Sequence, residues 1–307
     1  MNALKETPAD LKILDSKAEA LGFVSGEYSE AINGILPRLV ARFICDADKI
    51  PFHLADVELE LRILDSKWKI KANVDDIKFE VNSITIFFTL APKEFYYVST
   101  SNKFDSISNV VESLYFGSDI VGQDLLDTRP TEFNQMGVTD YTFLTTLLKS
   151  VGSPTVFSYG FNKLIINHLK DSPVKDIKEE EKPYDIDNKQ KSFIRHDLVE
   201  SSPNYNVVYF REGDEEVELL EWGGIKVQYN KDLSDCIYNL VENTIEQKKL
   251  KISTRIRSQR DLSISAGEIV NINLPDMDGT KYLVMDKLII LGSKLTFSYG
   301  LKSLDSN

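Results

Sequence analysis

Residues 250–301 decide the fold class, and they read LKISTRIRSQRDLSISAGEIVNINLPDMDGTKYLVMDKLIILGSKLTFSYGL. Apolar and polar residues alternate at Leu250–Arg257, Val270–Leu274 and Leu295–Leu301. A period of two places one set of side chains on a buried face and the other in water. Asp278-Gly279 supplies a tight turn between the second and third of four expected strands. The stretch therefore predicts an antiparallel barrel or sandwich, and it contains no catalytic set.

The same alternation fills the region between residues 35 and 99. The expected strands are Leu36–Ile44, Val57–Leu61, Lys67–Ala72, Ile77–Val81, Ile84–Phe88 and Glu94–Val98. Short strands at short spacing are typical of a small barrel or sandwich. Residues 1–34 show no clear period.

The middle of the chain changes to a helical period. The residues from Phe104 to Leu114 predict one helix, and those from Leu144 to Val151 predict another that opens near Thr139 and Asp140. The strands Val156–Tyr159 and Leu164–Asn167 are expected to follow.

The next residues are expected to be irregular before the periodic pattern returns. Residues 171–192 are rich in Lys, Asp and Glu and contain two prolines, which predicts an exposed loop. Further strands are expected at Phe193–Val199 and Tyr205–Phe210, then a hairpin at Gly223-Gly224 and a helix from Leu233 to Ile245.

Composition excludes several classes of protein. The 307 residues carry a net charge of −12, which disfavours a protein that grips DNA or RNA phosphates. No apolar run approaches the length of a membrane span, and the N-terminus does not resemble a secretory signal, so no membrane insertion is expected. The two cysteines, Cys45 and Cys236, are interpreted as buried reduced thiols.

A search for chemistry finds no motif. The three histidines, His53, His168 and His196, have no metal-ligand spacing, and His168 and His196 are interpreted as structural. Phosphate-binding, dinucleotide and nucleophile-elbow motifs are absent from the sequence. We therefore predict no catalytic, cofactor-binding or metal site and expect a protein that is not an enzyme. A hydrolase with a hidden carboxylate pair stays open as an alternative, because such pairs have no fixed spacing.

The order of elements resembles the baseplate hub proteins of contractile-tailed bacteriophages and the hub-like half of type VI secretion spike (VgrG) proteins. Three segments carry the resemblance: Val138–Gly152 with the strand pair after it, Phe193–Phe210, and Leu262–Val270 with the strands that follow. The resemblance covers roughly Phe104 to Leu301, and no residue in it performs chemistry.

This resemblance implies a mainly β fold with two similar antiparallel β-barrels and an α+β middle domain. The first barrel is expected at 1–100, the middle domain at 101–192 and 214–249, and the second, split barrel at 193–213 and 250–303. A homotrimer with two barrels per chain forms a pseudo-sixfold ring that joins a hexameric tail tube to a trimeric spike.

The resemblance also implies partners and a location. They are the tail tube protein and the central spike protein, with tape measure and baseplate wedge proteins as further partners. DNA is expected only as a passing cargo, repelled by an acidic lumen. The expected location is the baseplate of the virion tail, after synthesis in the host cytoplasm. The alternative is a β-rich receptor- or glycan-binding tail module with a groove at Trp68 or Trp222.

Overall fold

The computed structural model describes most of the first half of the chain and separate segments of the second half. The described residues are 8–15, 18, 21–45, 54–122, 133–150, 155–160, 163–169, 174–178, 184–187, 220–222, 225–227, 250, 252, 254–259, 261–273 and 280–304. The strands expected at Phe193–Val199 and Tyr205–Phe210, and the helix expected from Leu233 to Ile245, lie outside them.

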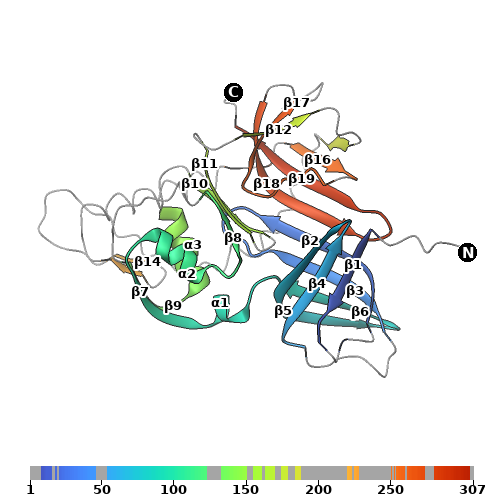
Figure 1. Ribbon diagram of the computed structural model, residues 1–307, viewed down its shortest axis with the longest axis horizontal. Coiled ribbons are helices and arrows are strands. Elements are labelled where there is room, and N and C mark those ends of the chain that lie inside the picture. Colours follow the sequence, from blue (N-terminus) through green and yellow to red (C-terminus); the bar gives the residue numbers. More distant parts are fainter. Residues whose placement is uncertain are drawn as a thin grey trace, which may run out of the picture.

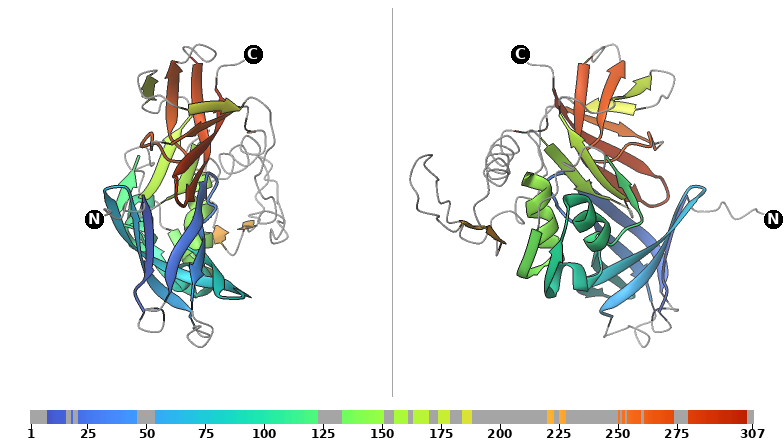
Figure 2. Two further views of the ribbon diagram at one scale, coloured as in Figure 1. Left: turned by 90° about the vertical axis from the view of Figure 1, so that its right-hand side faces the viewer. Right: turned by 60° about the vertical axis from the view of Figure 1, so that its left-hand side comes forward.

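A curled sheet of 12 strands dominates the described part of the chain (Figures 1 and 2). We call its first six strands the N-terminal half. In spatial order they are β1 (Ala9–Ile13), β4 (Asp56–Ile63), β5 (Ser66–Glu80), β6 (Ser83–Thr89), β3 (Arg38–Ile44) and β2 (Gly22–Ala31). All five pairings in this half are antiparallel.

The other six strands form the C-terminal half of the sheet. They are β18 (Thr280–Leu291), β19 (Thr296–Ser303), β16 (Thr254–Ser258), β13 (Tyr184–Asp187), β17 (Ile269–Asn273) and β12 (Val174–Lys178). β18 pairs with β2, β17 and β19, so it joins the two halves into one sheet. The β2–β18 register runs from Asp286 opposite Ala31 to Leu291 opposite Gly26.

A third group of elements, the middle unit, lies beside the sheet (Figure 1). It consists of α1 (Lys93–Tyr97), β7 (Ser99–Phe104), α2 (Ile107–Leu114), β8 (Asp119–Val121), β9 (Phe133–Thr139), α3 (Asp140–Ser150), β10 (Thr155–Tyr159) and β11 (Lys163–His168). The side chain of Ser106 accepts the Asn109 N–H at 3.1 Å at the start of α2, and Thr139 accepts the Thr142 N–H at 3.1 Å at the start of α3. Such N-caps satisfy amides that have no partner within the helix. A separate hairpin is formed by β14 (Leu220–Trp222) and β15 (Ile225–Val227).

Of the three buried apolar clusters among the described residues, two lie within these groups. The larger one runs through both halves of the sheet, with fully buried Leu39, Phe43 and Leu59 at one end and Phe297 and Leu301 at the other. The second core belongs to the middle unit. There Phe95 packs edge-on against Phe116, Tyr141 and Tyr159, with ring centroids 4.9, 5.9 and 5.9 Å away.

The predicted mainly β class is confirmed. In the part of the chain that the structure describes, the two ends form halves of one continuous sheet. The twin-barrel arrangement and its domain boundaries stay predictions.

Three local predictions are wrong. Lys67–Ala72 and Ile77–Val81 were expected as two strands, but β5 runs unbroken from Ser66 to Glu80. It changes partner near Asn73, from β4 to β6, with a bulge between Val74 and Asp76, so no turn is needed. The strand expected at Glu94–Val98 is the helix α1, whose Phe95 enters the aromatic core. The loop expected at 171–192 contains β12 and β13, because β17 and β16 offer edges with which they pair.

Candidate functional site

The predicted absence of a catalytic, cofactor or metal site stays a prediction. Within the described ranges, no group of three or more His, Cys, Asp or Glu residues could hold a metal ion. His168 ends β11 and shares a hydrogen bond with Thr155 at 3.0 Å, and Cys45 is buried. His53, His196 and Cys236 lie outside the described residues. None of the helices that the structure describes is long and apolar enough to cross a membrane.

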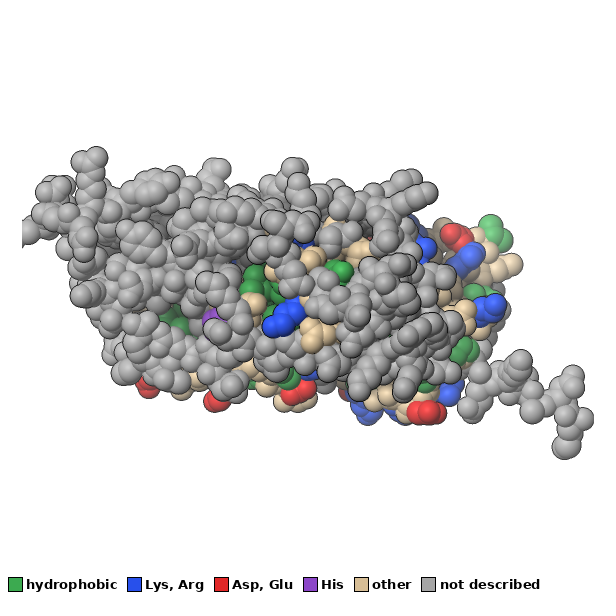
Figure 3. All heavy atoms as spheres, turned by 90° about the horizontal axis from the view of Figure 1, so that it is seen from above, with side chains coloured by type: hydrophobic (Ala, Val, Ile, Leu, Met, Phe, Trp, Pro, Cys, Tyr) green, Lys and Arg blue, Asp and Glu red, His purple; other side chains and the backbone are tan. Residues whose placement is uncertain are grey.

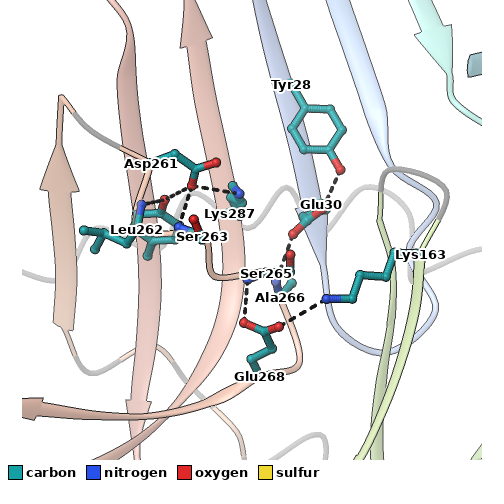
Figure 4. Close-up of polar contacts among 11 residues, drawn as sticks. Tyr28, Glu30, Lys163, Asp261, Leu262, Ser263, Ser265, Ala266, Glu268 and Lys287 are labelled. Atoms are coloured by element: carbon teal, nitrogen blue, oxygen red, sulfur yellow. Dashed lines mark hydrogen bonds and ion pairs between the residues drawn. The ribbon is translucent and has the colours of Figure 1, made fainter. Parts of the chain in front are cut away.

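The most elaborate polar arrangement surrounds a turn at Ser265–Glu268, where both sheet halves and the middle unit meet (Figure 4). We call it the junction. The turn forms because Gly267 has φ +87°, a conformation that is strained for residues with a Cβ. The Gly267 N–H donates to the Val284 carbonyl at 2.8 Å, and the Glu268 N–H donates to the Ser265 carbonyl at 3.2 Å. These bonds fix the turn against β18.

The N-terminal half reaches the turn through Glu30 of β2. The Glu30 side chain is 3% exposed; its Oε1 accepts the Ala266 N–H at 2.9 Å, and its Oε2 accepts the Tyr28 hydroxyl. Lys287 of β18 is the cross-strand neighbour of Glu30. Burial raises the pKa of Glu30, and this effect exceeds the opposing effects of Lys287, Tyr28 and Ala266.

The middle unit reaches the same turn from the β10–β11 hairpin. Asn167, which is 5% exposed, donates through Nδ2 to the Gly267 carbonyl at 2.6 Å, and Lys163 Nζ lies 3.4 Å from Glu268 Oε1. Glu268 also accepts the Ser265 N–H at 3.1 Å. Gly160 packs so closely that a Cβ there would lie 2.8 Å from Glu30 Oε2, so the hairpin can approach only because Gly160 has no side chain.

Lys287 is bound on the side of the C-terminal half by Asp261. Its Nζ lies 3.3 Å from Asp261 Oδ1 and 5.7 Å from the centroid of the Tyr299 ring. The same Oδ1 accepts the Tyr299 hydroxyl at 2.9 Å and the Ser263 N–H at 3.0 Å. Burial and the Asp261 charge raise the pKa of Tyr299 far above its ordinary value.

An apolar layer surrounds these polar groups. Its buried members come from all three groups of elements and are Ile32, Val156, Ile252, Ala266, Ile269, Leu283 and Met285. Ile32 also forms an isolated bridge to Ser158 of β10 and donates its N–H to the Met285 carbonyl at 3.0 Å. Among its described residues the junction contains no activated nucleophile. Its hydrogen bonds, ion pairs and apolar contacts connect the three groups of elements.

Sequence reasoning missed the junction. Glu30 lies in the region without a clear period. The sequence alone does not distinguish a glutamate that faces the interior from one that faces water. The one usable signal was Ala266-Gly267, which lies within the segment Leu262–Val270 that carries part of the resemblance.

The groove expected at Trp68 or Trp222 stays a prediction. Trp68 packs partly buried against the large core, and the side chain of Trp222 is not described. Large exposed apolar side chains lie near the ends of β3 and β5, namely Val81, 92% exposed, with Ile44 and Phe79. At the right-hand end of Figure 3, basic, acidic and apolar side chains lie interspersed.

No protein-family model matches the chain, and no curated protein matches it. The solved structures that are similar to it include the following three. A component of the type VI secretion system of E. coli, itself similar to the bacteriophage T4 tail proteins gp27 and gp5, has a TM-score of 0.55 and 10% identity, with coverage of 97% of this chain and 77% of that one. The 43 kDa tail protein of prophage MuSo2 from Shewanella oneidensis has a TM-score of 0.55 and 12% identity, with coverage of 96% and 97%.

A tail protein from Neisseria meningitidis MC58 has a TM-score of 0.53 and 9% identity, with coverage of 96% of each chain. Identities this low show the fold alone, so activity and partners cannot be carried over from these proteins. The similarity runs through nearly the whole chain, and the fold is therefore that of phage tail proteins.

Proposed function

We propose that the chain is a structural component of a phage tail or a related injection machine, and specifically a trimeric hub. The observation that carries this proposal is the similarity to two tail proteins and a type VI secretion component over 96–97% of the chain. Two of these proteins are tail proteins and the third is a component of a secretion system, which supports a role in assembly.

The join between the sheet halves supports the finer proposal. A trimer with two β-barrels per chain has six barrels around its axis, and that ring can contact a hexameric tube on one side and a trimeric spike on the other. Such a ring needs the two barrels of one chain at a fixed relative position. The β2–β18 pairing and the junction supply a fixed connection of this kind. The proposed domains are 1–100, 101–192 with 214–249, and 193–213 with 250–303.

The proposed partners are a second and third copy of the chain, the tail tube protein and the central spike protein, with tape measure and wedge proteins around them. DNA passes through the ring without being gripped. The net charge of −12 supports this last point, because an acidic protein repels phosphate. The proposed location is the tail baseplate of the virion.

Mass photometry of the purified chain, followed by electron microscopy, tests the hub. We expect particles of about three times the 34.9 kDa chain mass and rings with threefold symmetry. The control is the same measurement after addition of purified tail tube protein, which should add density to one face of the ring. A chain that stays monomeric at high concentration, and does not assemble when tube and spike proteins are added, contradicts the hub.

A further inference from the structure

Two strands of the N-terminal half have an edge at which no strand pairs in the part of the chain that the structure describes. Among the described strands, β1 lies at the end of the sheet and pairs with β4 alone. β5 pairs with β4 as far as Asn73, and from Asp76 to Glu80 its one described partner is β6. An open edge of this kind is where a second chain can add a strand.

The open edge of β1 carries the backbone groups of Leu11. The Leu14 N–H donates to the Glu58 carbonyl, and the Leu64 N–H donates to the Pro8 carbonyl, both at 2.8 Å. Residues 8 and 14 therefore face β4. Because hydrogen-bonding directions alternate along an antiparallel strand, the N–H and C=O of Leu11 point to the opposite edge. The side chain of Leu11 is buried in the larger core.

The open edge of β5 carries the backbone groups of Ile77. Glu80 and Ser83 flank a two-residue turn, and residues in that position exchange hydrogen bonds, so the alternate residues Lys78 and Asp76 also face β6. The Ile77 N–H instead donates to Oδ1 of Asp76 at 2.9 Å, an exposed bond that a carbonyl of a partner strand can replace. The side chain of Ile77 packs partly buried against the larger core.

The charges on the outer face favour one register between these two edges. One antiparallel register places Leu11 of one copy opposite Ile77 of a second copy. Both flanking pairs then carry opposite charges, and they are Asp10 with Lys78 and Lys12 with Asp76. A shift by two residues places either Asp10 opposite Asp76 or Lys12 opposite Lys78, and like charges directly opposite destabilise a strand pair. A shift by one residue turns the apolar side chains away from the core.

The same register extends a row of alternating charge on the outer face. Within one chain, Lys69 of β5 lies opposite Glu60 of β4, and Glu60 lies opposite Lys12 of β1. Asp76 of a second copy would be the next member of this row. On the other face, Phe79 is 50% exposed and would be covered by β1 of the neighbouring copy. The contact therefore combines complementary charge on one face with apolar burial on the other.

We propose that copies of this chain join head to tail, with residues 76–80 of β5 in one copy adding antiparallel to β1 of the next, so that the sheet runs from chain to chain. Each copy offers a different edge to each of its two neighbours, so the contact is heterologous. Repetition of this contact about a threefold axis closes it into a ring. The inference deepens the proposed hub and rests on it for the number of copies.

Cysteine cross-linking of the full chain tests the contact. Lys12 and Asp76 would form a non-hydrogen-bonded pair, in which the Cα atoms lie about 4.5 Å apart, within the range of a disulfide. The double variant K12C/D76C, treated with a mild oxidant, should therefore give covalent dimers and trimers on a non-reducing gel. The matched control is K12C/K78C, which belongs to a disfavoured register and should lose most of this cross-linking. The single variants K12C and D76C measure the background from Cys45 and Cys236.

A charge substitution tests the same contact without added cysteines. Asp76→Lys places a lysine opposite Lys12 and should raise the concentration needed for half-maximal assembly about two- to fivefold per contact. Asp56→Lys is the matched control, because Asp56 is also exposed on the outer face and the change in net charge is the same. This control should leave assembly unchanged.

The outcomes separate the contact from the hub. The contact is overturned, and the hub is not, by threefold particles that K12C/D76C fails to cross-link, by equal cross-linking of both double variants, or by equal effects of D76K and D56K. Covalent ladders that continue beyond three copies support the contact and contradict the hub. A chain that stays monomeric and forms no cross-link contradicts both.

Discussion

Basic and acidic side chains meet both on the outer face of the N-terminal half and at the junction, but they are exposed on the outer face and largely buried at the junction. On the outer face, Arg42 and Glu80 lie 2.7 Å apart with 51% and 52% of their side chains exposed. At the junction, Lys287 is 8% exposed in its side chain and Glu30 is 3% exposed overall. Water screens the first pair, whereas Lys287 and Glu30 are largely shielded from it. Charge in this protein therefore stabilises little at the surface and matters most where the three groups of elements meet.

Truncation of one side chain in the apolar layer at the junction should give the largest loss of stability. Leu283 is fully buried among residues from both sheet halves and the middle unit. Leu283→Ala should lower the free energy of unfolding by about 3 kcal/mol, through lost burial and the cavity that remains. The matched control is Val81→Ala, because Val81 is 92% exposed and its truncation should cost less than about 0.5 kcal/mol. Urea unfolding measures both, and equal costs would remove the contrast between the two regions.

Loss of a single buried hydrogen bond at the junction should give the second largest loss of stability. Asn167→Ala deletes the donor to the Gly267 carbonyl and leaves that carbonyl buried, at a cost of about 1–3 kcal/mol. Asn102 of β7 makes a longer bond, 3.0 Å to Gln135 Oε1, from an exposed position. Asn102→Ala should therefore cost less in the same urea titration. The reverse order would show that the turn does not depend on the middle unit.

The pH dependence of stability distinguishes the buried acid from the surface acids. The pKa of Glu30 is raised in the folded protein, so the folded state binds this proton more tightly than the unfolded state does. The resulting stability is fully present below the unfolded pKa of about 4.5 and is lost as the pH rises through the folded pKa. Wild type should therefore lose stability relative to E30Q between acidic and neutral pH. Parallel curves for the two proteins in urea titrations across this range would contradict the assignment.

The smallest effect is expected for the surface pair. A double-mutant cycle on Arg42→Ala and Glu80→Ala should give a coupling energy of about 0.2–1 kcal/mol that decreases as salt is added. Ser83 contacts both side chains, at 3.1 Å from Arg42 and 2.9 Å from Glu80, and is left unchanged in the cycle. A coupling that salt does not reduce would mean that this face is covered by another molecule under the conditions of measurement.

Alternation predicted the sheet well wherever one face is buried and the other is wet. Val57–Leu61 falls within β4, Ile84–Phe88 within β6, and Val270–Leu274 begins within β17. The helical period located α2 and α3 together with the Thr139 cap. These elements could be predicted from the local sequence, because the spacing of apolar side chains indicates which face of a strand or helix is buried.

Elements without such a signal were missed or misassigned. The strand β2 lies in the region that showed no period, since it contains glycines and only part of it is buried. The short alternation of β1 at Ala9, Leu11 and Ile13 was overlooked. The aromatic run at Phe95–Tyr97 fits a strand as well as a helix. The packing of Phe95 into the aromatic core favours the helix α1. Both cases depend on neighbours that are distant in sequence.

The sequence by itself determined the mainly β class, the helices α2 and α3 and the faces of most strands, because periodicity is a local property. Only the tertiary structure decided the difference between two glutamates of one strand, exposed Glu27 and buried Glu30. Both occupy β2, three residues apart, but only Glu30 lies beneath the Ser265–Glu268 turn, which belongs to the other end of the chain. The physical reason is that desolvation depends on what packs over a side chain, and here that is a segment 236 residues away.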